Sequence, residues 1–134
     1  MGLSVYFAAP LAEAEAMCRL AWHWRAEVTV CSRWHSAVSA GATDPRVPEV
    51  RRRILYENLV DIGGADVVLV DTRRGVPGAT LCELGYALAM NKRVVWLQPV
   101  GGRRTDGVRA TNIFDAHENV RVVHEEFEAW EALR

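Results

Sequence analysis

Three short segments of this chain are almost continuously apolar, and they constrain the fold more than any other feature. They are residues 3–9 (LSVYFAA), 66–70 (DVVLV) and 93–97 (RVVWL). Strands of an antiparallel sheet with one wet face alternate apolar and polar side chains, whereas strands of a parallel sheet are buried on both faces and read as unbroken apolar runs. The three segments therefore predict central parallel strands, which require helical crossovers between them.

The stretches between these runs supply the helices. Helical periodicity is expected over about 11–25, 49–63, 80–90 and 125–134, and two weaker strands are expected at 27–31 and 120–123. The predicted fold class is α/β: a doubly wound five-stranded parallel sheet in the flavodoxin-like, Rossmann-like order 2-1-3-4-5, with helices on both faces. Residues 1–134 are expected to form a single domain, since this length suits one core.

Two local features complete this prediction. Residues 35–48 contain Ser, Gly, Asp and two prolines, so we expect a long loop there that serves as a lid or a wall of a site. In the tail, the spacing of Phe127, Trp130 and Leu133 predicts that all three point toward the core from the last helix.

The composition narrows the classes of partner. Apolar residues make up 50% of the chain and the formal net charge is -1, which argues against disorder and against broad electrostatic binding to nucleic acid. The three cysteines include no CxxC pair and the histidines show no ligand spacing, so we expect no disulfide framework, metal or cofactor. No basic leader or membrane-spanning run is found. We expect a cytoplasmic protein whose partners are a small molecule and further copies of itself.

The strand order also predicts where a ligand binds. In the order 2-1-3-4-5 the switch point lies between the first and third strands, so a ligand should bind beyond their carboxyl ends. We therefore expect the ligand near residues 6–11 and 71–83. Asp71 ends the third strand, where it could accept hydrogen bonds from sugar hydroxyls or anchor its own loop.

Residues 71–89 (DTRRGVPGATLCELGYALA) form the most informative segment. Gly75 and Gly78 permit positive φ and close approach of the backbone, and the free amides of the following helical turn favour an anion or a polarised ligand atom. Gly85 and Ala87 are small enough to let this helix pack closely on the sheet. Glu83 would then be held rigidly at the switch point, as a nucleophile requires.

A second interpretation of Glu83 involves no chemistry. Thr80 and Glu83 fit the T-x-x-E pattern of a capping box, in which the carboxylate would satisfy the amide of Thr80 at the start of the helix. The local pattern is compatible with either role.

Several ordered motifs together resemble the nucleoside 2-deoxyribosyltransferase family, including its small members and relatives that hydrolyse nucleotide N-glycosidic bonds. The resemblance covers nearly the whole chain. The motifs are VYFAAPL at 5–11, CSRW at 31–34, ENLVDIGGADVVLV at 57–70, ELGYALAMNK at 83–92 read with Gly78, and TNIFD at 111–115.

The resemblance implies a covalent mechanism. In this family the Glu of ELGYA attacks C1′ of the sugar, expels the base through an oxocarbenium-like transition state and leaves a glycosyl-enzyme that a second base or water resolves. Glu83 stands at that position. Tyr6 matches the aromatic hydroxyl that orients this carboxylate, and its alternative is a half-buried strand tyrosine bonded elsewhere.

The same resemblance predicts substrate contacts, and the chain departs from the family pattern at two positions. Asn58 stands where the family often has an aspartate that contacts the substrate. An amide can hydrogen-bond there but cannot take a proton. Asp61, one helical turn later, either compensates for this change or is a solvated acid. Pro77 stands where some transferases place a second aspartate, so base recognition must differ. Asn112 resembles the asparagine that reaches a neighbouring subunit's site, which implies a homodimer or higher homo-oligomer; otherwise it is a turn residue.

Arg33 and Trp34 follow the second strand closely enough to meet the switch point. A guanidinium there could bind a phosphate, and an indole could stack on a base. The basic run Arg51, Arg52 and Arg53 is expected to be the solvated start of a helix, although its side chains could also meet an incoming phosphate.

The expected function is cleavage or transfer at the N-glycosidic bond of a (deoxy)nucleoside or nucleotide. Two alternatives remain open. The segment PGATLCE loosely resembles the PGGxGTxxE motif of cytokinin-activating phosphoribohydrolases, with Ala79 in place of the second Gly. The chain could also bind a nucleotide derivative without turnover, since fold does not fix function.

Overall fold

The computed structural model describes residues 2–41, 44, 46–107, 109 and 112–134. Its centre is one sheet of five parallel strands in the order β2-β1-β3-β4-β5, as predicted. The strands are β1 (Leu3–Ala8), β2 (Val28–Val30), β3 (Val67–Asp71), β4 (Arg93–Leu97) and β5 (Val120–Val123). The predicted α/β fold class is therefore confirmed.

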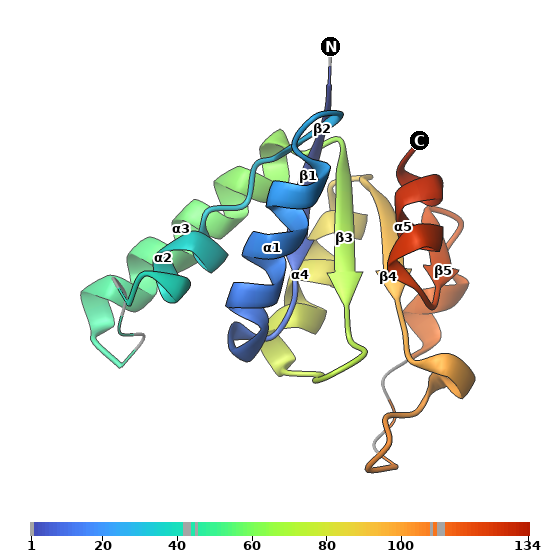
Figure 1. Cartoon of the computed structure of the whole chain (residues 1–134). Coiled ribbons are helices and arrows are strands. Elements are labelled where there is room, and N and C mark those ends of the chain that lie inside the picture. Colours follow the sequence, from blue (N-terminus) through green and yellow to red (C-terminus); the bar gives the residue numbers. More distant parts are fainter. Residues whose placement is uncertain (1, 42–43, 45, 108, 110–111) are drawn as a thin grey trace.

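Helices cover both faces of this sheet (Figure 1). On one face lie α1 and α5, with α2 packed beside α1, and on the other lie α3 and α4. The helices are α1 (Ala14–Trp24), α2 (Trp34–Ser39), α3 (Pro48–Gly64), α4 (Gly78–Ala89) and α5 (Glu126–Leu133), with short 3-10 turns η1 (Leu11–Glu13), η2 (Val100–Gly102) and η3 (Ile113–Ala116). In the described residues no helix is both long and apolar enough to cross a membrane.

The apolar runs explain why the centre of the sheet is dry. Every residue of β3 is buried, and β4 is buried after its first residue. Trp96 is the largest of these side chains, and its indole N–H donates to the hydroxyl of Thr72 at 2.9 Å, so the ring is buried without an unsatisfied donor. The central strands are thus fixed by burial on both faces.

Two local predictions were wrong. Residues 35–48 do not form one continuous loop, because α2 occupies Trp34–Ser39 and is held by the burial of Trp34 and His35. In α5, Leu133 is buried but the Phe127 side chain is 71% exposed, because it lies on the outer side of a helix of only eight residues.

The glycines in the segment after β3 have other structural roles than those predicted. Gly75 and Gly78 do not adopt positive φ. A Cβ at Gly75 would lie 2.9 Å from Cγ of Pro10, so this glycine lets the loop after β3 approach the loop after β1. A Cβ at Gly85 would meet no described atom within 4 Å, so the close packing of α4 comes from the buried Ala87 instead.

The contact at Gly75 yields a prediction about stability. Gly75→Ala would force the Pro10 ring and its loop apart, and we expect the free energy of unfolding to fall by about 1–3 kcal/mol. Gly78→Ala is the matched control, because its new methyl group would meet no described atom within 4 Å, and its effect should stay within about 0.5 kcal/mol. Urea unfolding of both variants measures the difference, and equal losses would contradict the steric argument.

Candidate active site

The centre of the candidate site is a contact between a strand and a helix that are distant in sequence. Tyr6 lies in β1 and Glu83 in α4, 77 positions apart, and the Tyr6 hydroxyl donates a hydrogen bond to Oε2 of Glu83. Tyr6 is fully buried by its neighbours in the sheet, so its ring is held in place by packing on both sides. The structure therefore brings together the two residues that the sequence nominates for catalysis.

The start of α4 shows what Glu83 does locally. The N-cap of α4 is Pro77, so Thr80 is the third residue of the helix and not its cap. The Thr80 amide donates to the carbonyl of Pro77 at 3.1 Å, and the Glu83 side chain turns instead to Tyr6. The capping-box interpretation of Glu83 is therefore wrong.

The surroundings of this pair shift the pKa of both groups. Burial raises the pKa of Glu83 to about 7, and the hydrogen bond from Tyr6 opposes part of this rise because it stabilises the carboxylate. Burial, and after it the charge of Glu83, raises the pKa of Tyr6 above its usual range. Tyr6 therefore remains a donor at neutral pH, while Glu83 is poised between its protonated and ionised forms.

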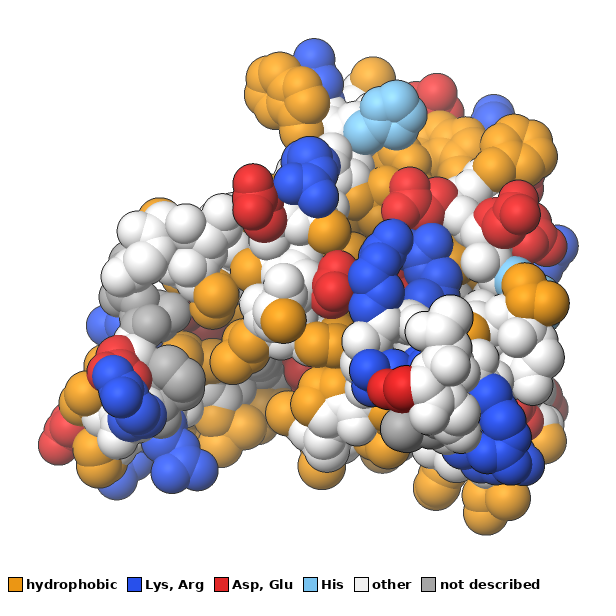
Figure 2. Space-filling model, turned by 60° about the horizontal axis from the view of Figure 1, so that its bottom comes forward, with side chains coloured by type: hydrophobic (Ala, Val, Ile, Leu, Met, Phe, Trp, Pro, Cys, Tyr) orange, Lys and Arg blue, Asp and Glu red, His pale blue; other side chains and the backbone are white. Residues whose placement is uncertain are grey.

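The Glu83 side chain lines a groove between α3 and α4 that has a volume of about 380 Å³. The walls are mostly apolar, and Asn58 and Arg51 of α3 add polar groups to the lining. The full lining consists of Arg51, Ile54, Leu55, Asn58, Leu59, Ala79, Cys82, Glu83 and Tyr86. Figure 2 looks onto this end of the molecule and shows hydrophobic side chains along the hollow beside the projecting corner at the left, where α3 begins.

Arg33 and Trp34 do not have the positions expected for substrate contacts. The Trp34 side chain is buried and its indole N–H donates to the Phe7 carbonyl at 2.7 Å, so neither ring face is open for a base. The Arg33 guanidinium binds Asp61, with Nη2 2.8 Å from Oδ1. Asp61 is buried, so it is not a solvated acid, and its hydrogen bonds with Arg33, and after them its charge, raise the pKa of Arg33.

The remaining nominated residues lie around the same edge of the sheet. Gly78 opens α4. Asp71 is 2% exposed and accepts from both the amide and the guanidinium of Arg73, so it anchors its own loop. Asn112 caps η3, its Oδ1 accepting from the Phe114 amide at 2.9 Å.

Comparison with solved structures shows that the fold of this chain is a known one. The structure resembles that of BlsM, with a TM-score of 0.68 and 21% identity over 95% of this chain and 83% of BlsM. It also resembles the CMP N-glycosidase BcmB of Clostridium botulinum, with a TM-score of 0.59 and 17% identity over 97% of this chain and 96% of that protein. At these identities the likeness is one of fold. No family model matches the chain, and no curated protein matches its sequence.

The sequence analysis named Asn58 and Arg51 but missed the apolar wall of the groove, to which Leu55 and Leu59 of α3 contribute. Arg51, Leu55, Asn58 and Leu59 recur at helical spacing and face α4 together. Such a stripe is visible in the sequence, but it is indistinguishable from one that packs against the core. Only the splaying of α3 away from α4 leaves it open.

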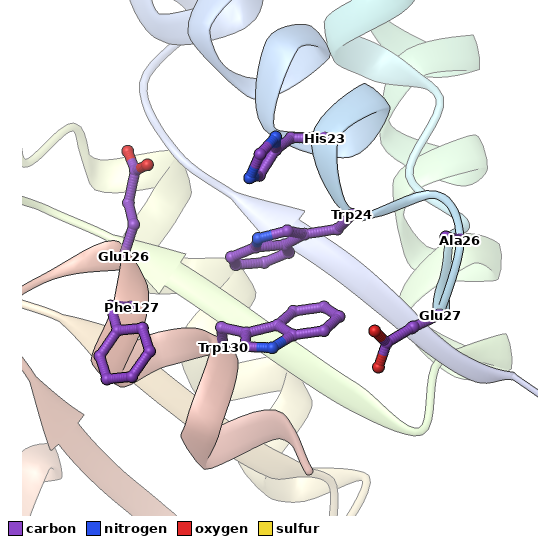
Figure 3. A pocket seen from close by; sticks show the side chains of 7 residues that line it. All are labelled: His23, Trp24, Ala26, Glu27, Glu126, Phe127 and Trp130. Carbon is purple, nitrogen blue, oxygen red and sulfur yellow. The ribbon is translucent and has the colours of Figure 1, made fainter.

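A larger hollow of about 460 Å³ lies on the opposite face, between α1 and α5. Figure 3 shows that the rings of Trp24 and Trp130 face each other across it, with Phe127 at one side. The two indole centroids are 5.4 Å apart, so the rings close much of the gap by packing on each other. This hollow contains none of the residues nominated for the site.

The raised pKa of Glu83 yields a prediction about stability. Between pH 4.5 and about 7 the folded protein holds the Glu83 proton more tightly than the unfolded chain, so the free energy of unfolding falls as the pH rises through this window. Glu83→Gln cannot ionise and escapes this loss. At about pH 8 we expect the variant to be more stable than the wild type by on the order of 1–3 kcal/mol.

Urea unfolding across this pH range measures the difference. The gap between variant and wild type should close toward about pH 4, where Glu83 is protonated in both the folded and the unfolded state. A gap that does not change with pH would show that the carboxylate is not destabilised by burial.

Proposed function

We propose that this protein cleaves the N-glycosidic bond of a nucleotide or nucleoside, with Glu83 as the nucleophile. The observation that carries the proposal is the ionisable carboxylate of Glu83, oriented by the buried hydroxyl of Tyr6 at the floor of an apolar groove. The fold likeness to a CMP N-glycosidase supports the same reaction class. Water or a second base resolves the intermediate, and hydrolysis and transfer differ only in this acceptor.

The proposed steps follow from the geometry of the pair. The ionised Glu83 oxygen attacks C1′ as the bond from C1′ to the base nitrogen breaks, and the departing base takes a proton from solvent. The Tyr6 hydroxyl holds the carboxylate in one orientation, so less rotational freedom is lost on reaching the transition state. An acceptor then cleaves the glycosyl ester and regenerates the free carboxylate.

The groove also suggests how the substrate lies. Apolar walls from Leu55, Leu59 and Tyr86 suit the flat faces of a base, and the Asn58 amide can both donate and accept a hydrogen bond. Among the residues that the structure describes, Arg51 has no acid within ion-pair distance. Its guanidinium is therefore available to a phosphate, and a nucleotide is the substrate class that we favour.

Removal of the nucleophile tests the reaction. We expect Glu83→Ala to lower base release by several orders of magnitude while the fold is retained, because the covalent route is closed and the oxocarbenium-like charge is left unstabilised. Glu131→Gln on the exposed side of α5 is the control and should release base at the wild-type rate. Chromatography of nucleosides and nucleotides after incubation gives the readout. A stable, fully active Glu83→Ala variant would end the proposed mechanism, and binding without base release in the wild type would indicate a sensor.

Replacement of Arg51 tests the substrate class. We expect Arg51→Ala to raise KM for a nucleoside monophosphate by about tenfold or more, the value of one charge-assisted hydrogen bond, and to leave the matching nucleoside unaffected. Arg52→Ala is the matched control, since Arg52 is exposed and does not line the groove. Steady-state kinetics on both substrates separates the outcomes, and equal losses on the two would exclude phosphate recognition by Arg51.

We also propose that the protein assembles with further copies of itself and that Asn112 reaches a neighbour's site. The segment after β4 carries the exposed apolar side chains of Val100, Ile113 and Phe114, and such side chains favour an interface. Light scattering on active samples should give a mass of at least two chains. Full activity of a strictly monomeric sample would remove Asn112 from this role.

A further inference from the structure

A hydrogen-bonded series of side chains lies apart from the groove, between α1 and α2. Sγ of Cys18 is 3.5 Å from Nδ1 of His35, and Nε2 of His35 is 2.9 Å from Oγ of Ser32. The Ser32 oxygen accepts in turn from the Phe7 amide at 3.1 Å. A partly exposed thiol is thus connected through two buried polar groups to the backbone of β1.

We assign the hydrogens from the bonding partners. The Ser32 oxygen accepts from the Phe7 amide, and in this assignment its own hydrogen points at Nε2 of His35. The proton of the neutral imidazole is then on Nδ1, directed at the sulfur of Cys18. Burial lowers the pKa of His35, which keeps the ring in this neutral form. A donor aimed at sulfur stabilises the thiolate, which is the reactive form of cysteine.

This thiol is also accessible. Cys18 and His35 both line a surface hollow of about 400 Å³ at the junction of α1, β2 and α2. The other two cysteines differ: the Cys31 thiol donates to the Asp61 carbonyl at 3.4 Å, and Cys82 is exposed in the groove beside Glu83. Cys18 is therefore set apart from them by an imidazole directed at its sulfur.

The far end of the series is next to the candidate catalytic tyrosine. The edge strand β2 ends at Val30, so Phe7 in β1 lies beyond its paired register. Two side chains replace the missing strand: the Ser32 hydroxyl binds the Phe7 amide and the Trp34 indole binds its carbonyl. Phe7 directly follows Tyr6, so a displacement of His35 and Ser32 acts on the strand that positions Tyr6.

We propose that Cys18 is a modification site for small electrophiles, activated by His35, and that its modification loosens β1 beside Tyr6. In the reaction with a haloacetamide, the thiolate forms a carbon–sulfur bond as the carbon–halogen bond breaks, and halide leaves. The thiol proton passes to solvent. The added group occupies the hollow and separates His35 from the sulfur, which frees Ser32 from its partner.

Site-resolved alkylation with limiting iodoacetamide tests the activation. In the wild type Cys18 should be labelled faster than Cys31, which is also only partly exposed; an equal or slower rate would overturn the proposal. His35→Asn keeps an N–H near the position of Nδ1 and should retain the fast rate. His35→Gln instead reaches the position of Nε2, and the rate should fall several-fold.

Cys31 serves as the internal control in every sample, because burial slows its labelling and an unchanged Cys31 rate therefore shows that the variant is folded. Equal Cys18 rates in the two folded His35 variants would overturn the role of His35. Should either variant unfold, the comparison of Cys18 with the exposed Cys82 in the wild type decides, and a Cys18 rate below that of Cys82 would overturn the activation.

Hydrogen exchange tests the connection to β1. Alkylation of Cys18 in a Cys82→Ser background should speed exchange of the Phe7 amide several-fold, while the Leu69 amide in the central strand stays protected. An unchanged exchange rate at the Phe7 amide would overturn the proposal that modification of Cys18 loosens β1. This readout needs no turnover, so it stands independently of the proposed reaction.

Discussion

The hydrogen bond from Tyr6 to Glu83 is the interaction on which the candidate site depends. It joins the central region of the sheet to a helix that begins beyond its carboxyl edge, and it places a carboxylate where burial disfavours its charge. Because Tyr6 is fully enclosed by the sheet, the position of Glu83 is set by the packing of β1 between β2 and β3. The chemistry of the groove is therefore tied to the geometry of one strand.

That strand is secured by the segment that follows β2. Ser32 and Trp34 bind the two backbone groups of Phe7, and Arg33 is paired with the buried Asp61 of α3. Three successive residues thus connect β1, α2 and α3, on both sides of the sheet edge. A side-chain clamp of this kind is needed because β2 has only three residues and cannot pair with the end of β1. Arg33 and Trp34, which the sequence suggests as substrate contacts, thus bond to other parts of the chain.

The sheet could be predicted because its central strands are buried on both faces, a condition that leaves an unbroken apolar run in the sequence. Local sequence patterns gave less reliable predictions where contacts between residues distant in sequence determine the structure. Trp34 and His35 form a helix within a Gly- and Pro-rich region because tertiary burial outweighs local propensity. The T-x-x-E pattern misassigns Glu83 because it contains no information on Tyr6, which lies 77 positions away. The apolar wall of the groove was missed because an apolar helical stripe that lines a groove has the same sequence pattern as one that packs on the core.

The raised pKa of Glu83 and its proposed reactivity have one physical origin. Burial makes the ionised form of Glu83 costly and, for the same reason, strengthens the attraction of this carboxylate to a positive charge. A solvated carboxylate would be more stable and less reactive. The hydrogen bond from the Tyr6 hydroxyl reduces the cost of burying the charge, since it stabilises the ionised form of Glu83 in place of water. In the proposed mechanism the stability lost by burying Glu83 is therefore the condition for its reactivity, whereas the carboxylate of Asp61 is neutralised by its ion pair with Arg33.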